Sequence, residues 1–294
     1  MFANVVQPSI VSLFSSTGST SLQLFSQHVD PAPVLRSDSL IHLLNDTTNL
    51  PPPPEPGVLV QSSFTSRTSE KDDDEKADSD TQRVGRTLCQ TVLHIQSPTL
   101  RTTYIRCPPH RSSSSPSKTP VELGLTLPWM HMQLCRLGER EWAFEVGIAD
   151  RAGRNGVIRC STFQKEATVV MHHDPPLLHV PLRFPEASTR PFTAWSSISI
   201  DLGSMNQQFH LISSSQQAAY ESSAHTQDED YENDVPNERI ARERSGINNA
   251  PLPSGGLGKV TYVKVYANCR LRRIWFSENK RGALPWEFEL YASS

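Results

Sequence analysis

Two short motifs contain residue types that bind zinc. His172, His173 and Asp174 are adjacent in the sequence, and Cys107 and His110 have CxxH spacing. A zinc site needs several such ligands that converge on one point. Adjacent residues of an extended chain point to opposite faces, and neither motif has a second ligand pair at a short spacing. We therefore expect no metal site, and the CxxH stretch is better explained as a strand that enters a turn.

Other catalytic patterns are incomplete. Residues 254–260, SGGLGKV, resemble a phosphate loop, but Pro253 stands where the first glycine is required. There is no GxSxG element, and no base can be identified for Cys135 or Cys160 as a nucleophile. The paired-carboxylate cleft of a hydrolytic β-sandwich cannot be located either. These gaps predict a protein without enzymatic activity and without a cofactor.

The residues best suited to bind a partner lie in residues 262–278, YVKVYANCRLRRIWFSE. Arg270, Arg272 and Arg273 stand there among residues typical of a buried strand. Asn268 interrupts the alternation, and the Arg272-Arg273 doublet puts charge on both faces, which a strand buried on both faces cannot accept. A bulge or an edge position would let the guanidinium groups leave the plane of the sheet. We therefore expect these arginines to line an exposed rim.

An alternative keeps the arginines inside the protein. Long basic side chains are rarely buried unless they are paired. The arginines could pair with acidic residues such as Glu287 and Glu289, or they could lie on a solvated face without a function. The two interpretations differ in what a substitution would cost the folded state.

The elements that position these side chains are predicted to be short strands. Apolar and small or polar residues alternate in residues 142–149 and 197–202, and in residues 262–267 the valines and alanine take one face while the tyrosines and Lys264 take the other. Further strands are predicted at residues 88–96, 101–107, 122–127, 157–162, 177–184, 259–267 and 286–291. Residues 37–45, SDSLIHLLN, read as a short helix with Ser37 or Asp38 as the N-cap. This pattern predicts an all-β fold, a β-sandwich or jelly roll, in a single domain.

Three stretches contain too few apolar residues to repay the entropy of ordering them. We expect disordered insertions at residues 46–87, 110–120 and 213–257. The first and the third of these insertions each contain an acidic run. Residues 70–80 hold seven acids and two bases, and residues 221–238 hold seven acids and no base. The rest of the chain then has 26 Lys and Arg against 17 Asp and Glu, a net charge of +9. A basic folded part favours an acidic partner, either nucleic acid or an acidic protein surface.

The sequence gives no sign of a membrane span or a disulfide framework. No stretch approaches the roughly 20 apolar residues that a spanning helix needs. Residues 1–14 lack a basic n-region, and Gln7 and Pro8 interrupt their apolar run, so a secretory signal is not expected. The five cysteines are odd in number and widely spaced, so we expect reduced thiols in an intracellular protein.

Taken in order, several of these segments resemble one known family. The stretches MFANVVQPSIVSLFSSTGSTSLQLF, LRTTYIRCP, LGLTLPWM, WAFEVGIADRAGRNGVIRCSTFQ, YANCRLRRIWFSE and LPWEFELY are similar to segments of the cilia- and flagella-associated protein 20 family. Of these, ANCRLRRIWFSE is the most specific. The resemblance implies a compact β-sandwich without enzymatic activity. It also implies a structural protein of cilia or flagella, at the inner junction of doublet microtubules or at basal bodies and centrioles.

The partners implied by the resemblance are tubulin in the microtubule and neighbouring inner-junction proteins, and a nuclear pool is a further expectation. The partner-binding residues that it implies are Asn268, Arg270, Arg272 and Arg273, with Arg101 and Arg106 as weaker candidates. The alternative is a nuclear nucleic-acid-associated adaptor that uses the same basic face. A third possibility, from another class, is a carbohydrate-binding β-sandwich.

Overall fold

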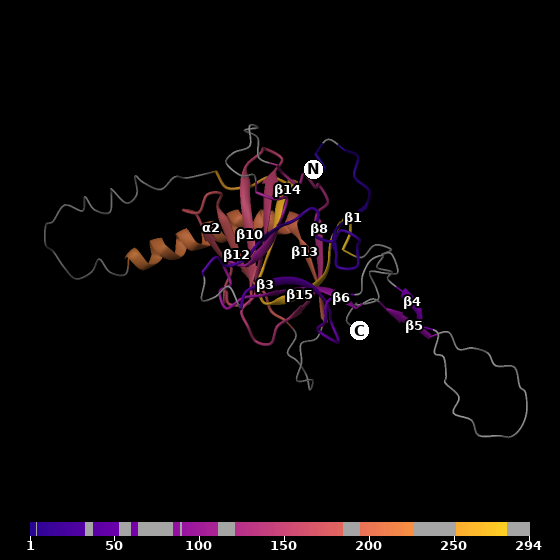
Figure 1. The fold of residues 1–294 in the computed structure, drawn as a ribbon. Coiled ribbons are helices and arrows are strands. Elements are labelled where there is room, and N and C mark those ends of the chain that lie inside the picture. Colours follow the sequence, from indigo (N-terminus) through magenta and orange to yellow (C-terminus); the bar gives the residue numbers. More distant parts are fainter. Residues whose placement is uncertain are drawn as a thin grey trace, which may run out of the picture.

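Two β-sheets packed face to face form the body of the protein (Figure 1). The computed structural model describes residues 1–3, 5–32, 38–52, 60–63, 85–88, 90–110, 121–184, 195–225 and 251–280. One sheet has six strands and the other has seven, while β4 (Val60–Ser63) and β5 (Gly85–Leu88) form a separate antiparallel pair. The predicted all-β, sandwich-like fold is confirmed.

The strand that carries the three arginines, β15, lies in the interior of the six-stranded sheet. It pairs with β8 along one side, and on the other side it pairs first with β6 and then with β1. The strand order is β13-β8-β15-β6-β3, so β13 and β3 are at the ends. The bounds are β1 (Ile10–Ser15), β3 (Leu40–Asn45), β6 (Thr91–Gln96), β8 (Trp129–Arg136), β13 (Trp195–Asp201) and β15 (Cys269–Ser277).

The seven-stranded sheet has the order β11-β12-β10-β9-β14-β7-β2. Its pairs are antiparallel except for β10 with β12, which is parallel. The bounds are β2 (Ser26–His28), β7 (Tyr104–Cys107), β9 (Ala143–Asp150), β10 (Asn155–Ser161), β11 (Thr168–Val170), β12 (Leu177–Pro181) and β14 (Leu257–Tyr266).

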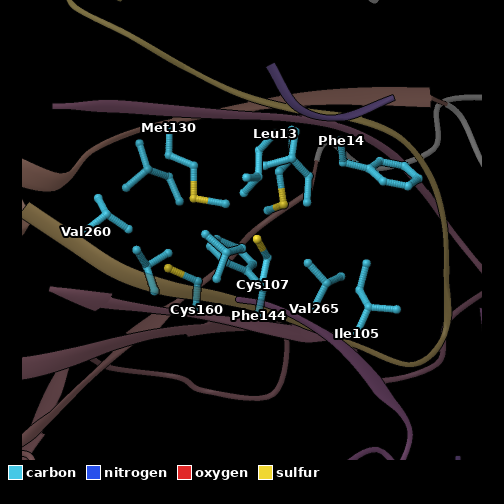
Figure 2. Close-up of a cluster of buried hydrophobic side chains, with 14 of the residues drawn as sticks. Leu13, Phe14, Ile105, Cys107, Met130, Phe144, Cys160, Val260 and Val265 are labelled. Carbon is cyan, nitrogen blue, oxygen red and sulfur yellow. The ribbon is translucent and has the colours of Figure 1, made fainter. Parts of the chain in front are cut away.

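The core fills the space between the sheets. Figure 2 shows Leu13, Phe14 and Met130 of the six-stranded sheet opposite residues of the other sheet, among them Ile105, Cys107, Phe144, Cys160, Val260 and Val265. Successive side chains of a strand point to opposite faces. In β14 the valines are buried in this core, as predicted, and Tyr262, Lys264 and Tyr266 lie on the outer face. In β9, however, all eight residues are buried, so this strand is covered on both faces.

One predicted element was wrong. Residues 37–45 were expected to form a short helix, but Leu40–Asn45 is strand β3, which pairs in full register with β6. A short apolar run such as LIHLL has no clear period, so pairing with a neighbouring strand decides its conformation. Residues 122–127 contribute a single bridge, Leu125 with Val260, rather than a strand. The strand predicted at residues 286–291 lies outside the described residues.

A long helix, α2 (Leu202–His225), lies against one end of the sandwich, and its later turns extend beyond the sheets (Figure 1). Asp201 is the N-cap of this helix, because its carboxylate accepts hydrogen bonds from the backbone N–H and the hydroxyl of Ser204. Leu202 and Phe209 are buried in the core. A disordered insertion was expected to begin at residue 213, but the helix continues to His225.

Asp150 fixes the loop between β9 and β10 and the segment that leads into β14. Its buried carboxylate forms a 2.7 Å salt bridge with Arg154 and accepts hydrogen bonds from the backbone N–H groups of Ala152, Ser254 and Gly255. Burial opposes ionisation, but these donors outweigh it and hold the pKa of Asp150 well below its usual range. One carboxylate thus joins two parts of the chain that are about a hundred residues apart in sequence.

Candidate functional site

The expectation that Arg272 and Arg273 line an exposed rim was wrong. Their exposed fractions are 1% and 4%. The predicted bulge is present, since the register of β15 against β8 shifts between Leu271 and Arg273. The bulge lets Leu271 and Ile274 both face the core while the two arginines leave it, and the guanidinium of Arg272 lies 4.9 Å from the ring of Trp195. The predicted edge position is absent, because β15 has strand neighbours on both sides.

Arg270 and Asn268 make contacts within the protein. Arg270 forms a 2.6 Å salt bridge with Asp46 and also donates a hydrogen bond to Asn49. Asn268 has a positive φ of 76° where the chain passes from one sheet to the other. Its side chain is buried, accepts a hydrogen bond from the N–H of Ser97 and donates one to the carbonyl of Glu141. The alternative prediction paired the arginines with Glu287 and Glu289, and these two residues lie outside the described ranges.

The two weaker candidates lie in different surroundings. Arg101 is exposed in the turn that precedes β7. Arg106 is half-buried on β7, with its side chain on the outer face of the seven-stranded sheet. Its guanidinium lies 4.4 Å from the centre of the Tyr262 ring and donates a 2.7 Å hydrogen bond to the carbonyl of Pro108. Arg106 therefore belongs to a group of outer-face residues far from Arg272 in the fold.

That group forms a single row across the seven-stranded sheet. The pairing register places one outer-face residue of each strand opposite the next, and we call this set the polar row. Its members, in strand order from β2 to β11, are Ser26, Arg106, Lys264, Glu145, Arg159, His179 and Thr168. The row contains three permanent cations, one histidine and one carboxylate, so its charge is positive.

Aromatic rings flank the polar row and hold its cations. The ammonium of Lys264 lies 3.9 Å from the ring centre of Tyr104 and 4.4 Å from that of Tyr266. Arg106 covers Tyr262, and the imidazole of His28 stacks on Tyr104 at 4.9 Å. Cations are attracted to the faces of aromatic rings. The rings thus fix the positions of the cations, and the cations occupy ring faces that could otherwise stack on a ligand.

Glu145 is the acceptor at the centre of the polar row. Its carboxylate forms a 2.5 Å salt bridge with Arg159 and accepts a 2.7 Å hydrogen bond from the hydroxyl of Tyr266. The hydroxyl of Tyr262 lies 3.5 Å from its other oxygen. Burial and then the charge of Glu145 raise the pKa of both tyrosines, so both remain protonated donors. The negative charge of Glu145 is therefore already neutralised within the protein.

The cations on the other side of Glu145 are less well compensated. Burial lowers the pKa of Lys264, and the attraction of Glu145 opposes this shift only in part. Burial also lowers the pKa of Arg106. Partial burial and the positive charges of Arg106, Lys264 and His28 lower the pKa of His110. This end of the polar row is a region of positive potential in which each cation disfavours the next.

The geometry offers little for covalent or metal chemistry. The described residues contain no group of three or more His, Cys, Asp or Glu side chains that could hold a metal ion. Cys107, Cys135, Cys160 and Cys269 are buried. Burial raises the pKa of Cys160 to about 12, which keeps its thiol protonated. No helix in the described part of the chain has the length and apolar character of a membrane span.

Sequence reasoning missed the polar row as a site. The alternation of Tyr262, Lys264 and Tyr266 on one face of β14 was visible, and it could have indicated a cationic and aromatic surface. The other members come from strands spread between Ser26 and His179. Their alignment depends on the register of six strand pairs, which no local pattern encodes.

The fold and the polar row define a β-sandwich module whose outer face suits the binding of acidic groups. The chain belongs to the CFA20 domain family, because the model of that family matches residues 58–218. It is similar to Cilia- and flagella-associated protein 20 of Chlamydomonas reinhardtii, with 25% identity over 203 residues, which are 68% of this chain and 74% of that protein. The resemblance predicted from the sequence is thus confirmed, although ANCRLRRIWFSE lies outside the range that the family model matches.

Proposed function

We propose that this protein is a non-enzymatic structural protein of cilia or flagella that binds microtubules. The observation that carries the proposal is its membership of the CFA20 domain family, supported by its similarity to a protein named as cilia- and flagella-associated. Within the cilium we place it at the inner junction of doublet microtubules, next to tubulin and neighbouring junction proteins, or at basal bodies and centrioles.

The surface chemistry supports a binding role rather than a catalytic one. The described thiols are buried, and the one carboxylate of the polar row is engaged by Arg159 and Tyr266. The cations Arg106 and Lys264 remain on the outer face of the same sheet. A positive face of this kind attracts an acidic surface over a distance comparable to the Debye length, about 10 Å at 0.1 M salt.

Two measurements test the proposal together. A tagged copy in native ciliated cells is expected to localise to the axoneme or the basal body. The purified full chain is expected to co-sediment with microtubules at low salt and to do so less at moderate salt, because exposed charge interactions are screened. Absence from cilia together with no co-sedimentation at either salt concentration would overturn the proposal.

The same experiment separates the nucleic-acid alternative. Sequence-independent nucleic-acid binding uses Lys and Arg on phosphates and, for single strands, aromatic rings that stack on bases. Here Arg106, Lys264 and His28 occupy faces of Tyr262, Tyr104 and Tyr266, which disfavours base stacking. A salt-dependent mobility shift with RNA or DNA, without co-sedimentation with microtubules, would replace the proposed function by a nuclear adaptor role.

A further inference from the structure

We propose that Arg106 and Lys264 form a binding site for the side-chain carboxylates of an acidic polypeptide segment in a partner protein. The two residues face each other across the antiparallel pair of β7 and β14. Like charges in directly opposed positions of a sheet are destabilising. A carboxylate between them would replace this repulsion by two attractive contacts. The inference rests on the proposed function in one respect, namely that the partner is a protein assembly.

The two positive charges at this position are compensated only in part by the described residues. Neither Arg106 nor Lys264 forms an ion pair with a described residue. Glu145 is opposite Lys264 on the other side, in β9, but its carboxylate is held by Arg159 at 2.5 Å and by Tyr266 at 2.7 Å. Lys264 is instead placed over the rings of Tyr104 and Tyr266. The site is therefore built and oriented while its charge remains available.

Two histidines lie beside the pair. His28 is exposed on β2 and stacks on Tyr104. His110 is also exposed; desolvation and then the charges of Arg106, Lys264 and His28 lower its pKa, so its imidazole offers a hydrogen-bond donor rather than a charge. A ligand with several carboxylates would contact more of this region than a single anion. An arginine beside a lysine suits this ligand, because the guanidinium can hold a carboxylate with two parallel hydrogen bonds.

The aromatic contacts argue for a polypeptide over a nucleic acid or a sugar. Both of those ligands use open ring faces for stacking. The rings beside the site are covered by Arg106, Lys264 and His28. Charge complementarity is what remains, and an acidic segment supplies it without a need for stacking.

The test uses the full chain and a fluorescent peptide of ten glutamates, titrated at low and moderate salt. The variants are Arg106→Gln and Lys264→Gln, and the matched control is Lys259→Gln. Lys259 lies on the same strand and loses the same charge, but it is already paired with Glu122. Each row variant is expected to weaken binding about three- to tenfold, and the control less than about twofold.

Thermal unfolding of the same proteins separates a binding role from a structural one. Neutralising one of two opposed like charges is expected to leave the melting temperature unchanged or to raise it. An equal loss of peptide binding in Lys259→Gln and Lys264→Gln would show general electrostatics and overturn the site. So would the absence of peptide binding, or binding that the row variants retain at wild-type strength.

Microtubule co-sedimentation of the variants distinguishes failure of the site from failure of the proposed function. If the wild type and Lys264→Gln bind microtubules equally well, the proposed function is kept and this site is overturned. A wild-type chain that binds the peptide through Arg106 and Lys264 but not microtubules keeps the site and loses the proposed function. Tighter binding to RNA than to the peptide, lost in the same variants, would assign the site to nucleic acid and overturn the inference.

Discussion

The carboxylate of Asp46 connects Arg270 on β15 with Trp195 on β13. Its Oδ1 lies 2.6 Å from Nη1 of Arg270, and its Oδ2 accepts a 2.9 Å hydrogen bond from Nε1 of Trp195. Arg270 also donates to the backbone carbonyl of Asp46 at 2.8 Å. Asp46 follows β3, which is at the opposite end of the strand order from β13. The turn after β3 is therefore joined to both β15 and β13 through this one carboxylate.

This connection predicts a measurable coupling between Asp46 and Arg270. Both side chains are mostly buried, with exposed fractions of 21% and 19%. A double-mutant cycle of Asp46→Ala and Arg270→Ala is expected to give a coupling energy of about 1 kcal/mol in urea unfolding. Each single substitution also breaks contacts outside the pair, that of Asp46 with Trp195 and those of Arg270 with Asn49 and the Asp46 carbonyl, which is why the cycle is needed. A coupling energy of zero would mean that the salt bridge does not stabilise the fold.

The buried arginines predict a loss of stability rather than a loss of binding alone. Arg272→Glu and Arg273→Glu would each place a carboxylate where the exposed fraction is 1% and 4%. An uncompensated buried charge costs about 3–5 kcal/mol, so early thermal unfolding is expected. The control is Arg101→Glu, which is exposed and should change stability by less than about 0.5 kcal/mol. If the variants of Arg272 and Arg273 unfolded at the wild-type temperature, the result would contradict the burial of these two side chains and favour a surface position.

The arginine doublet shows how far local sequence determines the fold. Charge on both faces of an apolar strand predicted either a bulge or an edge position, and the bulge is present between Leu271 and Arg273. Whether the strand lies at an edge depends on its neighbours, and β1 and β6 come from distant parts of the chain. An edge and an interior strand with a bulge have the same local sequence, so the sequence could not decide between them.

The helix α2 was missed for a different reason. Leu202, Met205, Phe209 and Ile212 recur at helical spacing, and all four contact the core. Most of the residues between them are Gly, Ser, Asn, Gln and His, a composition that also fits a disordered segment. The helix is stabilised by packing of this narrow stripe against the sandwich, which propensity does not report. The strand pattern of Val263 and Val265, by contrast, was read correctly because its period of two is uninterrupted.

The environment of His131 predicts a pH dependence of stability. Its imidazole is buried, stacks on Trp275 at 4.9 Å, and lies 2.8 Å from the hydroxyls of Ser199 and Ser277. Burial lowers the pKa of His131 from 6.5 to about 4. The unfolded chain therefore binds a proton first as the pH falls. The stabilising contribution is complete above about pH 6.5 and is lost progressively toward pH 4, by about 3 kcal/mol in total.

The measurement is the free energy of unfolding between pH 4 and pH 7.5 for the wild type and His131→Gln. The variant is expected to be less stable at pH 7.5 but to lose less stability on acidification, so that the two curves converge. His210→Gln, an exposed substitution on α2, serves as the control and should follow the wild-type curve. Parallel curves for the wild type and His131→Gln would show that His131 is not the titrating group.

A substitution at Gly147 tests how closely the outer face beside the polar row is packed. A Cβ at this position would lie 2.3 Å from two carbons of the Tyr262 ring and 2.4 Å from Oγ1 of Thr261. Gly147→Ala must therefore displace that ring, and overpacking of this kind costs about 1–3 kcal/mol. Gly255→Ala is the control, because the nearest atom to its added Cβ is 3.6 Å away.

The source of the clash can be identified by repeating the substitution without the ring. In a Tyr262→Ala background, Gly147→Ala is expected to cost less, because the Thr261 hydroxyl can rotate away whereas the Tyr262 ring is held by Arg106 at 4.4 Å. Urea unfolding of the four proteins measures this difference. An equal cost of Gly147→Ala in both backgrounds would place the strain in the backbone of β9, and a cost near zero in both would show that the face beside the polar row has room for a methyl group.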